Sequence, residues 1–274
     1  GSDIHYEGHG QGPVVMAVPN SWGLALDGLR GFYRPLENHV TMVYFDQRGI
    51  GDSAPSAIPE DMGLATVRSD FDGLRSHLGL GQVNAIGWSN GAMNLIVLAA
   101  EYPDSLRSAT FVHGAASFGE EDMRQWAERQ PDLFQNFGAL RQELEAGEMA
   151  DSEKTTLMKS FWVGQFFPLS CADPDAMRPR LEDFYRDIQF SWPHAQYGNR
   201  EAPVFDARDR LGQITTRCLV VAGAHDNVPP EKVRELHEGL SDSEFVVFPS
   251  SGHFAPLEEP EAFQATVLEV WGSQ

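Results

Sequence analysis

The chain has 274 residues, of which 42% are hydrophobic, and it contains 6 Trp and 17 Phe. This is enough apolar surface for one large α/β core with an insertion, and it excludes a chain that stays disordered. Forty acidic against 20 basic side chains give a formal charge of −20. Such a charge disfavours nucleic acid and anionic membrane surfaces as partners.

Nothing in the sequence indicates secretion or membrane insertion. No apolar run reaches about 18 residues, and no charged-then-apolar leader follows the Gly1-Ser2 start, which is typical of a cloning remnant. Only Cys171 and Cys218 occur, which does not indicate a disulfide framework. We therefore expect a cytoplasmic protein with a small-molecule substrate, and we leave a homodimer open.

Strand and helix patterns alternate through the first part of the chain. Short β-branched apolar runs closed by turn residues predict buried strands, and apolar residues at steps of three and four predict helices. In chain order we expect strands at Val14–Val18 and Thr41–Phe45, a helix at Leu64–Leu78, a strand at Val83–Ile86, a helix at Ala92–Ala100 and a strand at Ala109–Val112. This alternation predicts a mainly parallel central sheet with helices on both faces.

The alternation stops between residues 118 and 204. That segment is dense in aromatic residues at helical spacings and is broken by prolines. We interpret it as an inserted helical cap, with the core formed by residues 1–117 and 205–274. Most of its aromatics should form the cap's own core, while a few, of which Trp162 and Phe166 are our candidates, should line a pocket.

After the insertion the alternation resumes. We expect a strand at Cys218–Ala222, a helix at Glu231–Leu240, a strand at Phe245–Phe248 and a closing helix at Ala262–Trp271. These elements would complete the same sheet.

Ser89 lies in the pentapeptide Gly87-Trp88-Ser89-Asn90-Gly91, between a predicted strand and a predicted apolar helix. A serine in a tight strand-to-helix turn has a strained backbone, and glycines flank it because side chains there would collide. The turn holds the hydroxyl clear of the sheet. We therefore expect Ser89 to be a catalytic nucleophile.

With this motif the chain resembles the α/β-hydrolase superfamily over essentially its whole length. The resemblance implies a carboxylate after a later strand and a histidine after the last one. Asp226 follows the strand ending at Ala222, and His253 follows the strand ending at Phe248. Some family members place the acid at an earlier strand end, but His113 stands there and cannot serve as a carboxylate. A serine hydroxyl is a weak nucleophile until a base takes its proton, so we expect His253 as base and Asp226 as the group that orients it.

The resemblance also predicts an oxyanion hole of two backbone N–H groups. One donor should be Asn90. The other should come from the loop after the first apolar strand, where relatives carry a His-Gly opening and this chain has Pro19-Asn20-Ser21-Trp22. Strand-end alignment assigns that donor to Ser21. We expect Asn20, Trp22 and Trp88 to contact substrate.

A second loop, Asp46-Gln47-Arg48-Gly49, resembles the corresponding loop of prolyl iminopeptidases and their hydrolase relatives. We interpret it as structural, because an Arg and an Asp in a Gly-rich loop are readily explained as hydrogen-bonding a turn. The histidines are scattered at spacings that do not suit zinc, and the glycines around Ser89 do not match a dinucleotide fingerprint. We expect neither a metal nor a cofactor.

Three main functions remain open from the sequence, and carbon–carbon bond hydrolysis and cofactor-free perhydrolysis also use this triad. The first is hydrolysis of a small to medium, largely apolar carboxylic ester or lactone through an acyl-enzyme, favoured by the triad and the aromatic cap. The second is an aminopeptidase of the prolyl iminopeptidase type, although the His-Gly-Gly-Pro-Gly-like opening of those enzymes is absent. The third is a ligand sensor that keeps the triad but turns over slowly.

Overall fold

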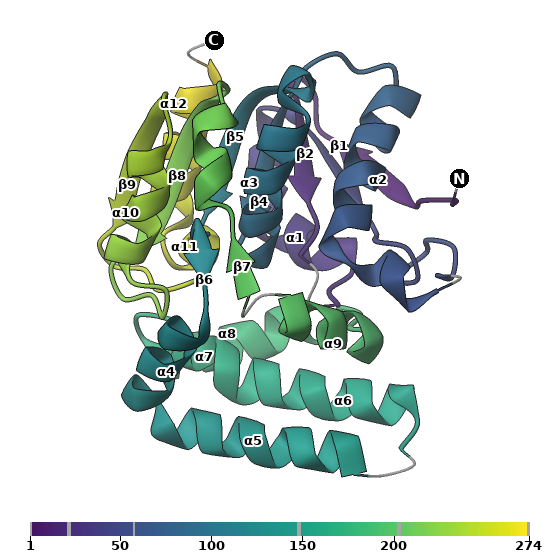
Figure 1. Cartoon of the computed structure of the whole chain (residues 1–274), viewed down its shortest axis with the longest axis vertical. Helices are drawn as coiled ribbons and strands as arrows, with labels where there is room; N and C mark the ends of the chain where they lie inside the picture. Colours follow the sequence, from purple (N-terminus) through teal and green to yellow (C-terminus); the bar gives the residue numbers. More distant parts are fainter. Residues whose placement is uncertain (1, 21–22, 57, 147–148, 202–203, 273–274) are drawn as a thin grey trace.

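The centre of the computed structural model is a seven-stranded sheet with the strand order β1-β3-β2-β4-β5-β8-β9 (Figure 1). The structure describes every residue except 1, 21–22, 57, 147–148, 202–203 and 273–274. All neighbouring strands are parallel except β1, which pairs antiparallel with β3. The strands are β1 Tyr6–His9, β2 Val14–Val18, β3 Thr41–Phe45, β4 Val83–Trp88, β5 Leu106–Val112, β8 Arg217–Gly223 and β9 Ser243–Phe248. This is the mainly parallel sheet that the alternation predicts.

Helices cover both faces of the sheet because its strands are apolar on both faces. In β3, Met42 and Tyr44 join one hydrophobic cluster, while Val43 and Phe45 join the other, as the two-residue period of a strand requires. The first cluster includes residues of α1 (Leu26–Tyr33) and α12 (Pro260–Gly272). The second includes residues of α2 (Leu64–His77), α3 (Asn90–Glu101) and α10 (Pro230–Gly239).

The inserted segment forms a helical layer across the carboxyl edge of the sheet (Figure 1). It comprises α4 Glu120–Arg129, α5 Pro131–Ala146, α6 Asp151–Phe161, the π-helical turn η4 Trp162–Phe166, α7 Phe167–Leu169, α8 Pro174–Tyr185 and α9 Trp192–Glu201. Its two ends are joined by an antiparallel pair of short strands, β6 (Ser117–Phe118) and β7 (Phe205–Asp206). The insertion therefore leaves and re-enters the core at one place.

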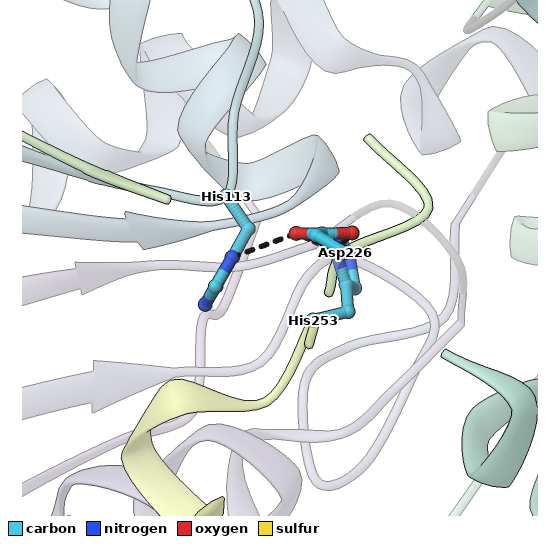
Figure 2. Close-up of side chains that lie close together, drawn as sticks. All are labelled: His113, Asp226 and His253. Atoms are coloured by element: carbon cyan, nitrogen blue, oxygen red, sulfur yellow. Dashed lines mark hydrogen bonds and ion pairs between the residues drawn. The ribbon is translucent and has the colours of Figure 1, made fainter. Parts of the chain in front are cut away.

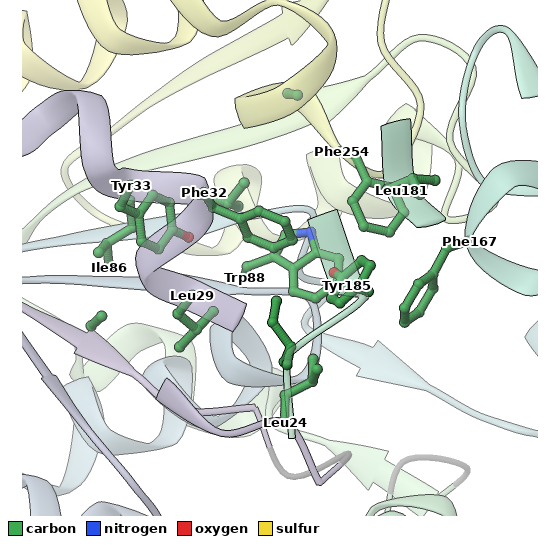
Figure 3. Close-up of a cluster of buried hydrophobic side chains, with 14 of the residues drawn as sticks. Leu24, Leu29, Phe32, Tyr33, Ile86, Trp88, Phe167, Leu181, Tyr185 and Phe254 are labelled. Carbon is green, nitrogen blue, oxygen red and sulfur yellow. The ribbon is translucent and has the colours of Figure 1, made fainter. Parts of the chain in front are cut away.

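An aromatic cluster joins this helical layer to the core (Figure 3). The Phe32 ring stacks on that of Phe184 at 5.2 Å, and it meets Trp88 edge-on at 4.9 Å. Leu24, after β2, forms an isolated backbone bridge with Phe190. The cap is thus packed against the core by buried side chains.

Shorter elements connect these parts: η1 Arg34–Asn38, η2 Pro59–Met62, η3 Pro103–Ser105, η6 Arg208–Gln213 and α11 Ala255–Glu258. None of the helices that the structure describes combines the length and the apolar character needed to cross a membrane.

Strand β1 and helix α1 are among the elements that the sequence analysis did not predict. Strand β1 contains Glu7, Gly8 and His9 and has no apolar run; it is a strand because it pairs with β3. Helix α1 contains two glycines, which lower helix propensity. A Cβ at Gly31 would collide with the Phe184 ring, so this glycine permits the cap to approach the helix. Both elements depend on tertiary contacts that a local pattern does not contain.

The packing of α2 on the sheet gives a stability prediction. Phe71 is fully buried and its ring lies 6.4 Å from that of Phe45. We expect Phe71→Ala to lower the free energy of unfolding by about 3–5 kcal/mol, because it removes a large buried side chain and leaves a cavity. Urea unfolding measures this, with Ser69→Ala on the exposed side of the same helix as control, expected within ~0.5 kcal/mol of wild type. A loss below about 1 kcal/mol for Phe71→Ala would contradict the packing.

Candidate active site

Ser89 lies in the turn between β4 and α3 with a backbone conformation that few non-glycine residues adopt. Its φ is 55° and its ψ is −121°, and its N–H donates to the carbonyl oxygen of Val112 at 2.8 Å. Two flanking glycines make the turn possible. A Cβ on Gly87 would lie 2.5 Å from the carbonyl oxygen of Gly91, and one on Gly91 would lie 2.8 Å from that of Val18. The turn thus projects the Ser89 hydroxyl beyond the end of the sheet.

A chain of hydrogen bonds connects Ser89 to two side chains from distant loops. His253, in the loop after β9, has its Nε2 2.8 Å from Ser89 Oγ. Its Nδ1 lies 2.9 Å from both carboxylate oxygens of Asp226, in the loop after β8. The structure therefore brings together all three residues that the motif and the resemblance predict, within hydrogen-bonding distance and in the order that base catalysis at a serine needs.

The Asp226 side chain has no exposed surface, so its charge depends on its partners. Burial by itself would raise the pKa of its carboxyl group. The charge of His253 and the contacts from His113 and His253 outweigh burial and hold the pKa of Asp226 well below its usual range. The N–H of Val228 also donates to Oδ1 at 2.9 Å. Asp226 is therefore ionised beside His253.

Glu258 holds the backbone on both sides of His253, a role that the sequence analysis missed. Its Oε2 accepts the N–H groups of Gly252 at 2.9 Å and Phe254 at 3.0 Å, and its Oε1 accepts that of Ala172 in the cap at 2.7 Å. The N–H of His253 itself donates to the carbonyl oxygen of Ser170 at 2.7 Å. The histidine loop is thus tied to the cap. Glu258 stands five positions after His253, and no local motif distinguishes it.

His113 is a second histidine beside Asp226, although from the sequence it was considered only as a residue that cannot serve as the acid. It follows β5, is fully buried and has a φ of 56°. Its Nδ1 lies 2.8 Å from Asp226 Oδ2 (Figure 2), although not in the geometry of a straight hydrogen bond. The only sequence signal for this contact is a polar residue at the end of a buried strand.

The predicted oxyanion-hole residues are described in part. Asn90 is buried and is the first residue of α3, where backbone N–H donors of the first helical turn gather. Ser21 and Trp22 lie outside the described residues. Asn20 is buried, and its carbonyl oxygen accepts a hydrogen bond from Gln47 Nε2 at 2.6 Å. It is not among the residues lining the cavity beside Ser89.

A cavity of about 290 Å³ opens above Ser89 and His253, between the sheet edge and the cap. Its walls are mostly large apolar side chains from the cap, and Trp162 and Phe166 are among them, as expected. The apolar lining residues from the cap are Phe118, Met123, Trp126, Leu133, Phe134, Phe137, Leu140, Leu144, Met158, Trp162, Phe166 and Trp192. Both predicted aromatics belong to the π-helical turn, and their rings lie 6.3 Å apart.

Trp88 was expected to contact substrate, and the structure corrects this expectation. Its side chain is buried in the core beside Phe32 and Phe254 (Figure 3) and does not line the cavity. Its indole N–H donates to the carbonyl oxygen of His253 at 2.8 Å. Successive residues of a strand point to opposite sides, so the residue before the turn faces the core while Ser89 faces the cavity. Trp88 therefore supports the histidine loop from the core side, through the carbonyl oxygen of His253.

The Asp46–Gly49 loop is held by its own polar side chains, in line with the structural interpretation. Asp46 accepts the N–H groups of Leu26 at 2.8 Å and Asp52 at 3.1 Å. Arg48 forms a two-point ion pair with Asp70, with distances of 2.9 and 2.7 Å. Both charged groups are thus engaged in fixing the loop.

His113, Asp226 and His253 are also the described residues whose potential ligand atoms lie close enough to surround a metal ion, within 4.8 Å of one another. The sequence spacing did not predict this grouping, because the three residues come from different loops. In the present arrangement both Nδ1 atoms approach the carboxylate oxygens. These contacts require N–H protons, which metal binding would displace.

Known proteins resemble this chain over most of its length. Residues 19–260 match the model of the alpha/beta hydrolase fold family. A proline iminopeptidase of Clostridium botulinum is 26% identical over 244 residues, covering 86% of this chain and 81% of the relative. A 2-hydroxy-6-oxo-6-phenylhexa-2,4-dienoate hydrolase of Comamonas testosteroni is 25% identical, covering 97% and 90%.

Solved structures resemble the whole chain. An enol-lactonase from Burkholderia xenovorans LB400 superimposes with a TM-score of 0.74 at 21% identity, covering 98% of this chain and 96% of the other. An esterase from Exiguobacterium antarcticum gives a TM-score of 0.75 at 21% identity, with the same coverage. The chain belongs to the α/β-hydrolase family, and the predicted fold class is confirmed.

The contacts of Glu258 give a second prediction. We expect Glu258→Ala to lower the free energy of unfolding by roughly 2–5 kcal/mol, because it strips a charged acceptor from three backbone N–H groups. Glu244→Ala, which removes the same charge from an exposed position on β9, is the control and should change little. Thermal and urea unfolding compare the two. Equal effects of both substitutions would contradict the role assigned to Glu258.

Proposed function

We propose that this hydrolase cleaves small to medium, largely apolar carboxylic esters or lactones through an acyl-enzyme on Ser89. The observation that carries the proposal is the continuous hydrogen-bonded chain from Ser89 through His253 to Asp226, beside an apolar cavity of about 290 Å³. A buried, ionised carboxylate and a strained serine turn are the parts that acyl transfer to a serine requires.

In the acylation step, Ser89 Oγ attacks the carbonyl carbon while His253 Nε2 takes its proton. Asp226 holds the Nδ1–H tautomer and stabilises the imidazolium that forms. Charge develops on the carbonyl oxygen, for which we assign the N–H groups of Asn90 and Ser21 as donors. The C–O bond then breaks, and the leaving alkoxide takes the proton from His253.

In the deacylation step, His253 takes a proton from water as the water oxygen attacks the acyl carbon. Collapse of the tetrahedral intermediate returns the proton to Ser89 Oγ and releases the carboxylic acid. With a lactone the alcohol and the acid remain in one molecule, and the product is a hydroxy acid. The chemistry needs no group beyond those in this chain and water.

The carboxylates around the cavity do not favour a substrate with a charged amine. Among the described lining residues, Glu145 is the only carboxylate, and its Oε1 is paired with Arg141 Nε at 2.8 Å on the exposed surface. An aminopeptidase must take a charged amine out of water, and leaving it unpaired costs several kcal/mol. The apolar walls instead favour a group without charge.

An aminopeptidase of the prolyl iminopeptidase type is the second candidate. It is favoured by the proline iminopeptidases among the relatives and by the Asp46–Gly49 loop. Against it stand the contacts of that loop, whose charged groups are engaged in fixing a turn, and the pairing of Glu145 with Arg141. A substrate comparison separates the two.

The first functional prediction concerns Ser89. We expect a fluorophosphonate to label Ser89 covalently and Ser89→Ala to lower kcat by roughly 10⁴ to 10⁶, the range found when a triad nucleophile is removed. Mass spectrometry of the labelled peptide and ester kinetics measure this, with Ser250→Ala at an exposed position of the histidine loop as control. A label located on another residue would refute the assignment. Labelling of Ser89 without turnover of any ester, lactone or amide would favour a ligand sensor.

The second functional prediction concerns substrate class. We expect kcat/KM for neutral p-nitrophenyl esters or lactones to exceed that for prolyl-p-nitroanilide by at least about tenfold, which needs only ~1.4 kcal/mol of differential transition-state binding. Both activities are measured on the same sample. Each is attributed to this active site only if it is lost in Ser89→Ala. Preference for the prolyl amide would promote the aminopeptidase.

A further inference from the structure

His113 is a buried titratable side chain beside the triad that the mechanism above does not use. It stands at the end of β5, next to the strand that carries Ser89, and its ring lies 5.2 Å from that of His253. The β-sheet holds it there firmly, because its N–H donates to the carbonyl oxygen of Val221 at 2.9 Å. A histidine in the left-handed region inside a buried site is uncommon and calls for a physical reason.

The hydrogen bonds of the ring decide which nitrogen of His113 carries the proton. Its Nε2 accepts the backbone N–H of Ala255 at 3.3 Å, so that nitrogen presents a lone pair. The proton of the neutral ring is therefore on Nδ1, which lies 2.8 Å from Asp226 Oδ2 (Figure 2). Without that proton, two lone pairs would face each other in a site closed to water.

The ring is neutral because of its surroundings. Burial lowers the pKa of His113 and outweighs the opposite effect of Asp226, so the neutral imidazole brings its Nδ1–H to within 2.8 Å of the carboxylate without adding a charge. The other ionisable groups that face this site are His253, Glu258 and the Cys171 thiol, whose pKa burial raises. Asp226 thus lies between two imidazoles, one of which is a fixed neutral donor.

We propose that His113 is a positioning residue: its Nδ1–H holds the Asp226 carboxylate and shares its negative charge with His253. The proposal rests on the proposed function of the triad. A carboxylate whose charge is partly compensated by a further N–H close by stabilises the His253 imidazolium less than it would without that group. His113 therefore affects how strongly Asp226 stabilises the imidazolium that forms when His253 takes the proton of Ser89.

The test is the pH dependence of fluorophosphonate labelling at Ser89, measured between about pH 5 and pH 9, where a histidine base titrates. His113→Ala removes the donor. His113→Asn keeps an N–H at the position of Nδ1, and Asn is also among the residues that adopt a positive φ. Leu219→Ala, which deletes a fully buried side chain from the neighbouring strand β8, controls for loss of packing alone.

We expect His113→Ala to slow labelling by roughly 10- to 100-fold on the plateau, as for loss of a hydrogen bond to a charged group. The part of the pH–rate curve in which labelling slows at low pH, its acid limb, should move to higher pH by about 0.5 to 1 unit. The reason is that the carboxylate then holds the His253 proton more tightly. His113→Asn should restore most of the rate and the wild-type limb. Leu219→Ala should lower stability without moving the limb.

The outcomes separate this inference from the proposed function. Wild-type protein that is not labelled at Ser89 overturns the triad and the kinetic role of His113 together. Labelled wild type with an unmoved acid limb in His113→Ala overturns the role of His113 alone. If His113→Ala does not fold, the ring ¹⁵N chemical shifts of His113 in wild type decide: a neutral Nδ1–H ring supports the proposal, and an Nε2–H ring or an imidazolium overturns it.

Discussion

The contact between the Asp226 carboxylate and the Nδ1 of His253 is the interaction on which the site depends. A charge taken fully out of water costs several kcal/mol unless donors replace the lost hydration. Here the donors are His253 and the N–H of Val228, and His113 Nδ1 lies 2.8 Å from the carboxylate. The three groups follow three different strands of the sheet. Placing the carboxylate therefore fixes the loops after β5, β8 and β9 relative to one another, and the fold and the site form together.

The two non-glycine residues with positive φ in the described part of the chain are Ser89 and His113. They follow neighbouring strands, β4 and β5, and both continue the hydrogen bonding of the sheet by one residue, to Val112 and Val221. Conformations of this kind cost about 1–3 kcal/mol each and persist only where the surroundings determine them. The buried strands supply that constraint. They aim one side chain at the cavity and the other at the carboxylate.

The cap has a second role besides enclosing the cavity. It accepts the N–H of His253 through Ser170 and shares the Glu258 carboxylate through Ala172. Trp88 supports the same loop from the core side through the His253 carbonyl oxygen. The base is therefore held between core and cap, so changes in the cap near Ser170 affect the geometry of proton transfer as well as the shape of the pocket.

The sequence by itself determined the architecture and the three residues of the hydrogen-bonded chain, because both follow from patterns of neighbouring residues in the chain. Buried parallel strands appear as short apolar runs, and Ser89, Asp226 and His253 each follow such a run at a turn rich in glycine or proline.

Strand β1 and helix α1 were missed because pairing and packing, rather than their own residues, make them regular. Trp88 was assigned to the wrong side of the turn, since a residue name does not say which way the last position of a strand points. The contacts of His113 and Glu258 were decided only by the tertiary structure, because each joins groups far apart in the chain: His113 lies 113 residues before Asp226, and Glu258 reaches Ala172 across 86. Such contacts depend on which strands become neighbours, and no local pattern carries that information.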